Sequence, residues 1–280
     1  MTKDFSAVRL ELDSRPEAPA IVRAALTGVA QLLELDSQLF DDLKTAVSEA
    51  CNNVVLYAYE GKPGPLVAGL EIRPEGIVAT IRDWGRDIQH VGPSDERMGV
   101  GLAVISALAD RAEFIRVPDG GTEVRMTFTD GAAAIRRLER RPGSESPSGV
   151  PVELSGDVVV TVWPVGLLAG VLGRLARAVA ARTHLSLDRF SDLYLLTDAI
   201  AAFAQSAAAA AGMTFALEGS HKRLELTVGP FRAGHGERLL RDGLLGQNGA
   251  PVLGELTLEP VDGFEVLRVV VEERRGARQR

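Results

Sequence analysis

Val47-Ser48-Glu49-Ala50-Cys51-Asn52-Asn53 is the stretch of this 280-residue chain that decides its fold. It lies within an apolar-periodic segment, from about residue 38 to 59, that predicts a helix. Glu49 and Asn53 stand four residues apart, so their side chains share one face of that helix. Cys51 points about 160° away from that face and is interpreted as a small core residue. The helix thus offers a carboxylate and an amide to one end of a pocket.

Two further motifs follow in the chain. Asp83-Trp84-Gly85 ends the apolar run Ile77–Ile81, which predicts a buried strand. Gly99-Val100-Gly101 then opens an apolar helix from Leu102 to Leu108, whose free backbone N–H groups suit a phosphate. Each motif alone has an ordinary structural reading, such as a turn, a solvated helix face or, for Trp84, packing. Their joint occurrence in this order predicts a nucleotide site.

These residues resemble the nucleotide site of the GHKL (Bergerat-fold) ATPases. Within that superfamily they are most similar to the bacterial anti-sigma factors that are also serine protein kinases. The resemblance spans roughly residues 8–129, and its most specific parts are Val47–Ala50, Asn53 and Ala58-Tyr59-Glu60. It implies an α+β fold of two-layer sandwiches, with helices on one face of a mixed, mostly antiparallel sheet.

The resemblance also implies roles for individual residues. Asn53 would hold the Mg²⁺ that bridges the ATP phosphates, and Glu49 would act as general base toward a substrate serine. Asp83 would accept a hydrogen bond from the adenine amino group, where Gly85 lets the backbone approach the base. These roles suit the chemistry, because Mg²⁺ prefers oxygen ligands and phosphoryl transfer needs a carboxylate near the attacking hydroxyl.

Five further residues belong to the same expected pocket or to its partner surface. Thr122, after Gly120-Gly121, would touch the adenine site, and Gly99 and Gly101 would lie beside the phosphates. Arg97, next to these glycines, is open between a phosphate contact and a solvated side chain. Arg23, on the first predicted helix, matches an arginine that contacts the partner protein in the family.

The chain departs from the family pattern at two places. Asp87 stands where relatives usually carry a second glycine, which tolerates close backbone approach better. The segment from Asp87 to Gly99, which forms a lid over the phosphates in relatives, is short. Both departures motivate an alternative in which the protein senses ATP without transferring phosphate.

Composition argues against several other classes of protein, namely nucleic-acid-binding, membrane, secreted and metal-binding ones. The net charge of −7 gives no sign of a nucleic-acid surface, and there is no uncharged apolar run of 18 residues for a membrane span. The start of the chain lacks the apolar core of a secretory signal, and the one cysteine excludes an internal disulfide. The four histidines show no metal spacing. We therefore expect a cytoplasmic protein.

The order of predicted elements occurs twice, which indicates a tandem duplication. The expected domains are an ATP-binding domain (1–130), a Pro-, Gly- and Ser-rich linker (131–156), a degenerate second domain (157–274) and a basic tail (275–280). The first domain is predicted to contain a strand at 8–12, helices at 17–33 and 38–59, a hairpin at 66–82, a helix from residue 100 and strands at 112–117 and 123–128. The second repeats these elements from a strand at 157–161 to a hairpin around 256–266.

The second domain lacks the nucleotide residues. Aligned with one residue deleted, it places Asp198 opposite Glu49 and Ala202 opposite Asn53, and alanine has no oxygen for magnesium. Pro230 falls near the position of Asp83. We therefore predict that the second half keeps the fold and has lost the nucleotide.

The function that the resemblance implies is that of an anti-sigma factor. It would sequester a sigma factor and phosphorylate a serine of a STAS-type anti-anti-sigma partner, using ATP and Mg²⁺. Relatives act as homodimers, so a duplicated chain would be a monomer that acts as an intramolecular pseudo-dimer. The alternative is a non-catalytic, ATP-sensing interaction scaffold, so protein serine kinase activity is left open at this stage.

Overall fold

The computed structural model describes residues 8–73, 76–86, 96–129, 152–239 and 255–273, without the side chains of residues 96–98. Asp87, the lid segment up to residue 95, most of the predicted linker and the whole predicted tail lie outside these ranges. The first half contains β1 (Val8–Asp13), α1 (Ala18–Leu33), α2 (Ser37–Asn53), a π-helical turn (Val54–Ala58), β2 (Pro65–Arg73), β3 (Gly76–Asp83), α3 (Glu96–Leu108), β4 (Arg111–Arg116) and β5 (Thr122–Phe128).

The second half repeats this order. It contains β6 (Val158–Val162), a 3₁₀ turn (Val165–Leu167), α5 (Leu168–Ala180), α6 (Leu187–Ala207), β7 (Met213–Ser220), β8 (Arg223–Arg232), α7 (Gly236–Leu239), β9 (Glu255–Val261) and β10 (Phe264–Glu272). Strands and helices thus lie within a few residues of the predicted bounds. Two differ: α3 begins before residue 100, and the predicted helix 38–59 becomes a π-helical turn after Asn53.

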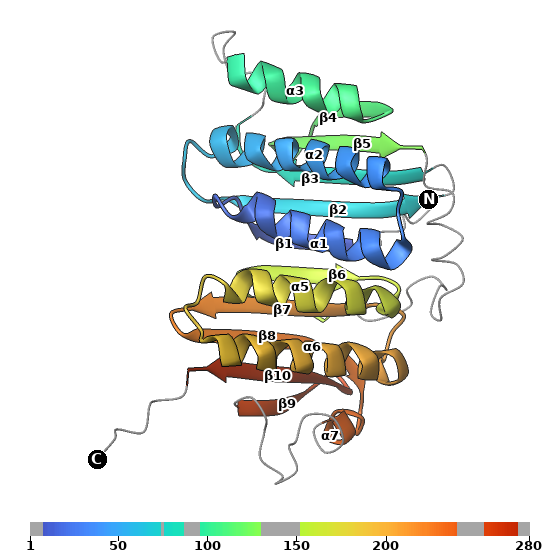
Figure 1. Ribbon diagram of the computed structural model, residues 1–280, viewed down its shortest axis with the longest axis vertical. Coiled ribbons are helices and arrows are strands. Elements are labelled where there is room, and N and C mark those ends of the chain that lie inside the picture. Colours follow the sequence, from blue (N-terminus) through green and yellow to red (C-terminus); the bar gives the residue numbers. More distant parts are fainter. Residues whose placement is uncertain (1–7, 74–75, 87–95, 130–151, 240–254, 274–280) are drawn as a thin grey trace.

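The strands of the described residues form one ten-stranded sheet in the order β4-β5-β3-β2-β1-β6-β7-β8-β10-β9, visible from top to bottom in Figure 1. All of its strand pairs are antiparallel. The order in the second half mirrors the order in the first about the β1–β6 pair. The predicted α+β fold class is confirmed, with one difference: the two sandwiches share a continuous sheet.

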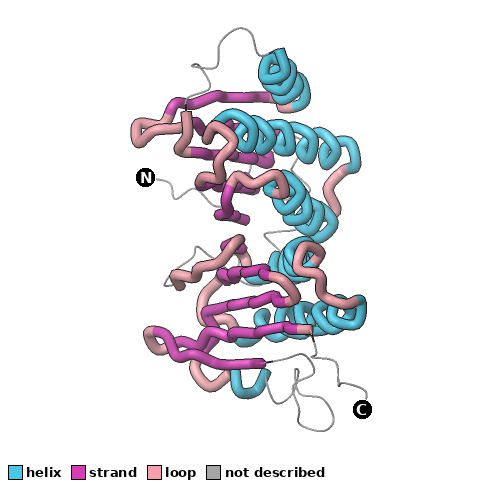
Figure 2. Tube along the Cα trace, turned by 90° about the vertical axis from the view of Figure 1, so that its left-hand side faces the viewer, coloured by secondary structure: helices cyan, strands magenta, loops and turns pink. Residues whose placement is uncertain are grey.

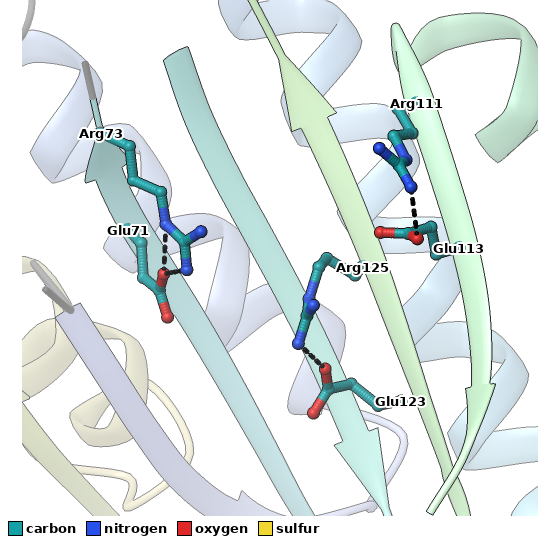
Figure 3. A network of polar contacts seen from close by, with 6 residues as sticks. All are labelled: Glu71, Arg73, Arg111, Glu113, Glu123 and Arg125. Atoms are coloured by element: carbon teal, nitrogen blue, oxygen red, sulfur yellow. Dashed lines mark hydrogen bonds and ion pairs between the residues drawn. The ribbon is translucent and has the colours of Figure 1, made fainter. Parts of the chain in front are cut away.

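The helices cover one face of this sheet, so the molecule has two layers (Figure 2). The strands show why, because β1 alternates strictly between buried and exposed residues and places Val8, Leu10 and Leu12 under the helices. The other face is polar. Figure 3 shows three of its ion pairs, in which Arg73, Arg111 and Arg125 each bind the glutamate two residues away on the same strand.

The two halves meet along β1 and β6 and along α1 and α5. Leu10 pairs with Val160 at the middle of the strand contact, and the hydrophobic core is continuous across it. The helices cross at two glycines: a Cβ atom on Gly28 would lie 2.1 Å from the carbonyl oxygen of Gly170. Arg182 forms an ion pair with Glu17 at the other end of the same helix pair. None of the described helices is both long enough and apolar enough to cross a membrane.

Candidate functional site

The carboxyl end of α2 carries the amide that the sequence singled out. The helix starts at a capped position, where the Asp36 carboxylate accepts hydrogen bonds from the backbone N–H groups of Gln38 and Leu39 at 2.9 and 3.3 Å. It ends at Asn53, which is only 7% exposed and whose Nδ2 atom has no hydrogen-bond partner. A π-helical turn follows directly, a feature that is frequent at functional sites. A buried amide without a partner suits a group that a ligand completes.

Helix α3 brings a glycine onto this end of α2. A Cβ atom on Gly101 would lie 3.2 Å from Oδ1 of Asn53 and 3.4 Å from Oε2 of Glu49. The three predicted residues therefore meet in space, and Glu49 is half-buried beside the amide. A larger side chain at residue 101 would press on both oxygens.

The predicted opening of the glycine helix is corrected by the structure. Helix α3 begins at Glu96, so Gly99 lies within its first turn instead of before it. Gly99 is exposed, and a Cβ atom there would meet nothing within 4 Å. Glycine lowers helix stability but does not prevent a helix, which explains why the helix extends through both glycines. The side chain of Arg97 lies outside the described part, so its predicted phosphate contact stays a prediction.

The adenine end of the expected pocket is built by β3 and β5. Asp83 ends β3, is 3% exposed, and accepts a hydrogen bond on Oδ1 from the Gly85 N–H at 2.8 Å. Gly121, at φ +78°, lies against it, because a Cβ atom there would come within 2.1 Å of the Asp83 carbonyl oxygen. The next residue, Thr122, is 3% exposed, and its hydroxyl has no hydrogen-bond partner. Asp83, Gly85 and Thr122 thus lie together, as the sequence predicts.

Gly85 connects the two ends of the pocket. A Cβ atom on Gly85 would lie 2.2 Å from the carbonyl oxygen of Ala58, and the same oxygen accepts from the N–H of Arg86 at 2.8 Å. Ala58 is five residues beyond Asn53 at the end of the π-helical turn. The turn therefore carries the chain from the amide to the aspartate, and both belong to one site.

Tyr59 is a positioning residue to which sequence reasoning assigned no role. Its hydroxyl donates to the Pro65 carbonyl oxygen at 2.6 Å and accepts from the Trp84 N–H at 2.8 Å. Burial raises the pKa of this phenol above its usual value, and the Trp84 hydrogen bond opposes that shift. The side chain holds the loop after Asp83 in place. The sequence contains one indication that Tyr59 matters: it lies in Ala58-Tyr59-Glu60, one of the stretches that most resemble the family.

Two other sequence expectations concern residues away from this pocket. Cys51 is fully buried, and burial raises the pKa of its thiol to about 12, which confirms its interpretation as a core residue. Arg23 lies half-buried on α1, where its charge partly opposes that shift. Trp84 is 38% exposed with the Arg82 guanidinium 4.6 Å from its ring centre, so it packs only in part.

The structure corrects the alignment between α2 and α6. Buried positions coincide when 150 is added to each residue number, without a deletion, from Leu39 and Arg189 to Val54 and Ala204, except that Asn53 is buried and Phe203 is half-buried. Ala199 therefore stands opposite Glu49, and Phe203 opposite Asn53. The proposed one-residue deletion was wrong because it matched acidic residues by type, whereas packing fixes the helix face.

The sheet register places Pro230 at the position of Asp83. In the first half Leu10 pairs with Ala68, and Ala68 with Ile81, two residues before Asp83. In the second half Val160 pairs with Phe215, and Phe215 with Val228, two residues before Pro230. This agrees with the prediction from sequence.

Protein side chains occupy the corresponding end of the second half. The rings of Phe203 and Phe231 lie 6.2 Å apart between centres. Glu265 accepts hydrogen bonds from the N–H groups of Gly234 and Gly236 at 2.6 and 2.7 Å. Among the described residues, no cluster of three or more His, Cys, Asp or Glu side chains could hold a metal ion in either half.

Comparison with known proteins defines the class. A histidine kinase-like ATPase domain matches residues 12–128, which implies nucleotide binding by the first half. An anti-sigma F factor from Caldanaerobacter subterraneus subsp. tengcongensis is 30% identical over 130 residues, covering 43% of this chain and 91% of that protein. A serine-protein kinase RsbW from Bacillus thuringiensis is 32% identical over 141 residues, covering 45% and 87%. The chain belongs to this family of anti-sigma factors and serine-protein kinases.

Proposed function

We propose that the chain is an ATP-dependent anti-sigma regulator whose first half binds Mg-ATP and whose second half does not. It would sequester a sigma factor and phosphorylate a serine of a STAS-type anti-anti-sigma partner. The observation that carries the proposal is the meeting of Glu49, Asn53 and Gly101 at one end of α2, joined by the π-helical turn to Asp83 and Thr122. The names of the two relatives point the same way.

The residues present fit the expected ligand. Asn53 and Thr122 each have a buried polar atom without a partner, and Asp83 keeps a carboxylate in a buried position. The amide oxygen of Asn53 would hold Mg²⁺ together with phosphate oxygens and water. Asp83 would accept a hydrogen bond from the adenine amino group, which guanine lacks at that position. Thr122 would add a second polar contact at the same end.

Glu49 is the residue we assign to catalysis. It lies one helical turn before Asn53 and on the same face, so its carboxylate reaches the side of the magnesium site where a substrate serine would approach. There it would accept the proton of the attacking hydroxyl as the oxygen bonds to the terminal phosphorus of ATP. ADP would leave with the bridging oxygen. The bound Mg²⁺ would supply neutralisation of the phosphate charge.

The test separates a kinase from a non-catalytic ATP sensor. Glu49→Gln is expected to keep Mg-ATP affinity and to lower phosphate transfer to the STAS partner at least about a hundredfold. Asn53→Ala is expected to lose both. Labelled ATP and isothermal titration measure the two quantities on the same preparations. Tight ATP binding by the wild type without any transfer to a STAS or sigma partner would favour the sensor instead.

The pseudo-dimer is part of the same proposal. Each half carries the same order of elements, and β1 meets β6 as two protomers would meet across a two-fold axis. The full chain is therefore expected to be a monomer in solution. A stable dimer of full chains in light scattering would contradict this.

A further inference from the structure

A cleft of about 330 Å³ opens on the helix face between α1, α5 and α6, away from the nucleotide pocket. Both halves of the chain line it. Gly28 and Gln31 come from α1, Arg174 and Arg177 from α5, and Tyr194 and Asp198 from α6. None of these residues belongs to the site described above.

One glycine of the cleft stands at the position of an arginine in the first half. The offset of 150 that aligns α2 with α6 also aligns the buried positions of α1 and α5, and it places Gly173 opposite Arg23. A Cβ atom on Gly173 would lie 3.0 Å from the Thr197 hydroxyl and 3.4 Å from a guanidinium nitrogen of Arg177. Thr197 and Arg177 thus lie close to Gly173, where a longer side chain would displace them, and the cleft opens beside this glycine.

The cleft is positively charged. Arg174 donates to Oε1 of Gln31, and the Arg177 guanidinium stacks 5.3 Å from the ring centre of Tyr194. Within the described residues neither arginine forms an ion pair, and Asp198 is the one acidic residue in the lining. Two guanidiniums against one carboxylate leave room for another carboxylate, which guanidinium binds well.

Beside the cleft, α6 exposes large apolar side chains. Leu187, Tyr194 and Leu195 are 83%, 55% and 61% exposed. The residues opposite them on α2 are the polar Ser37, Lys44 and Thr45. Since the two helices share one burial pattern, packing within the chain does not require apolar residues there. Exposed aromatic and aliphatic residues grouped on one helix are typical of an interaction site.

We propose that Arg174, Arg177, Tyr194 and Leu195, named here the α5–α6 surface, dock a segment of a partner protein. The segment would place an Asp or Glu carboxylate between the two arginines and aliphatic side chains over Tyr194 and Leu195. The positive charge of the cleft favours a carboxylate, and the exposed apolar residues beside it favour aliphatic side chains. A free small anion would satisfy the charge but would leave Leu195 uncovered. This inference rests on the proposed function, because it takes the molecule that occupies the cleft to be a protein partner of the regulator.

Photocrosslinking in the full chain tests the proposal. Benzoylphenylalanine replaces Tyr194 in one variant and Lys44, the matched position of the first half, in another. Cells of the source organism are irradiated, and the joined peptide is identified by mass spectrometry. The crosslink is expected from residue 194, to a segment of another protein that contains an acidic residue and aliphatic residues.

A second set of variants tests whether the two arginines are needed for the crosslink. Arg174→Ala combined with Arg177→Ala, in the chain that carries the probe at residue 194, is expected to lower the crosslink yield at least about tenfold. Urea unfolding confirms that the variant folds, and Mg-ATP titration is expected to give unchanged affinity. That titration separates the docking surface from the nucleotide pocket.

The proposal fails in any of the following cases. These are a crosslink from residue 44 alone, a crosslink to a second copy of this chain, a segment without an acidic residue, and a yield that the arginine variants leave unchanged. Absence of any crosslink at residue 194 also overturns it. In each case the ATP titration and the phosphate-transfer assay still decide the proposed function separately.

Discussion

At the scale of single residues, the pocket is shaped by positions where a side chain has no space. Gly85 and Gly121 each bring backbone against backbone, at Ala58 and at Asp83. The Tyr59 hydroxyl makes two hydrogen bonds, to the Pro65 carbonyl oxygen and the Trp84 N–H, that hold the loop after Asp83 in place. Nδ2 of Asn53 and the hydroxyl of Thr122 are then buried without partners. The site is therefore held in shape by the chain itself.

Gly85→Ala is expected to distort this arrangement. Its Cβ atom would lie 2.2 Å from the Ala58 carbonyl oxygen, so the loop or the π-helical turn must move. We expect a loss of about 1–3 kcal/mol in the free energy of unfolding, measured in urea, together with weaker ATP binding. For the stability measurement, Gly99→Ala is the matched control, because open space surrounds it and alanine favours a helix. Equal stability of the Gly85 variant and the wild type would contradict the described contact.

Cys51 is expected to be inert in the folded protein. At a thiol pKa of about 12, thiolate makes up about one part in ten thousand at pH 8, and the side chain is fully buried. Ellman's reagent should therefore detect no thiol in the native state and one per chain in guanidinium. Rapid reaction of the native protein would show that α2 opens more readily than its packing indicates.

The sequence could predict most of the pocket because its residues lie in short motifs on regular elements. Asn53 and Glu49 are related by helix periodicity, and Asp83 ends an apolar strand. The role of Tyr59 in holding the loop after Asp83 was not predictable, since its hydrogen-bond partners depend on how two loops meet. The counterpart of Asn53 was misassigned to Ala202, because only the packed helix face identifies Phe203.

At the scale of elements, α2 is the helix on which the site depends. Its first turn is capped by Asp36, and its last turn carries the amide. The π-helical turn shifts the chain after Asn53 so that Ala58 meets Gly85. Helix α3 contributes Gly101, although it begins earlier than its glycines suggest. In the sequence, Ser94 and Asp95 stand directly before Glu96, and these are residue types that favour a helix start.

Asp36→Ala is expected to lower the stability of the first half. Two backbone N–H groups at the start of α2 would lose their acceptor, at a cost of about 1 kcal/mol. Thermal unfolding followed by circular dichroism measures the change. Asp36→Asn keeps an acceptor oxygen and should recover most of the loss. A melting temperature that the alanine variant leaves unchanged would show that the cap contributes nothing.

At the scale of the whole molecule, the two halves form one sheet and one core. This junction was not predictable from sequence, because an amphipathic strand such as β1 carries the same alternation whether it lies at an edge or in the middle. The element order did predict the repeat. The consequence is that the second half supports the first half through β1–β6 and α1–α5.

Gly28→Leu tests how strongly the halves depend on each other. The new side chain would collide with the Gly170 backbone, where a Cβ atom alone comes within 2.1 Å of its carbonyl oxygen. We expect a loss of at least about 2 kcal/mol in the free energy of unfolding. Thr45→Leu, at an exposed position of α2, is the control and should stay near the wild type. Wild-type stability of Gly28→Leu would mean that α1 and α5 do not pack as described.

Isothermal titration of Mg-ATP tests the central claim most directly. The wild type is expected to bind one nucleotide per chain, Asn53→Ala to bind none, and Phe203→Ala, the matched position of the second half, to bind one with unchanged affinity. Two sites in the wild type, or wild-type affinity in Asn53→Ala, would contradict the account.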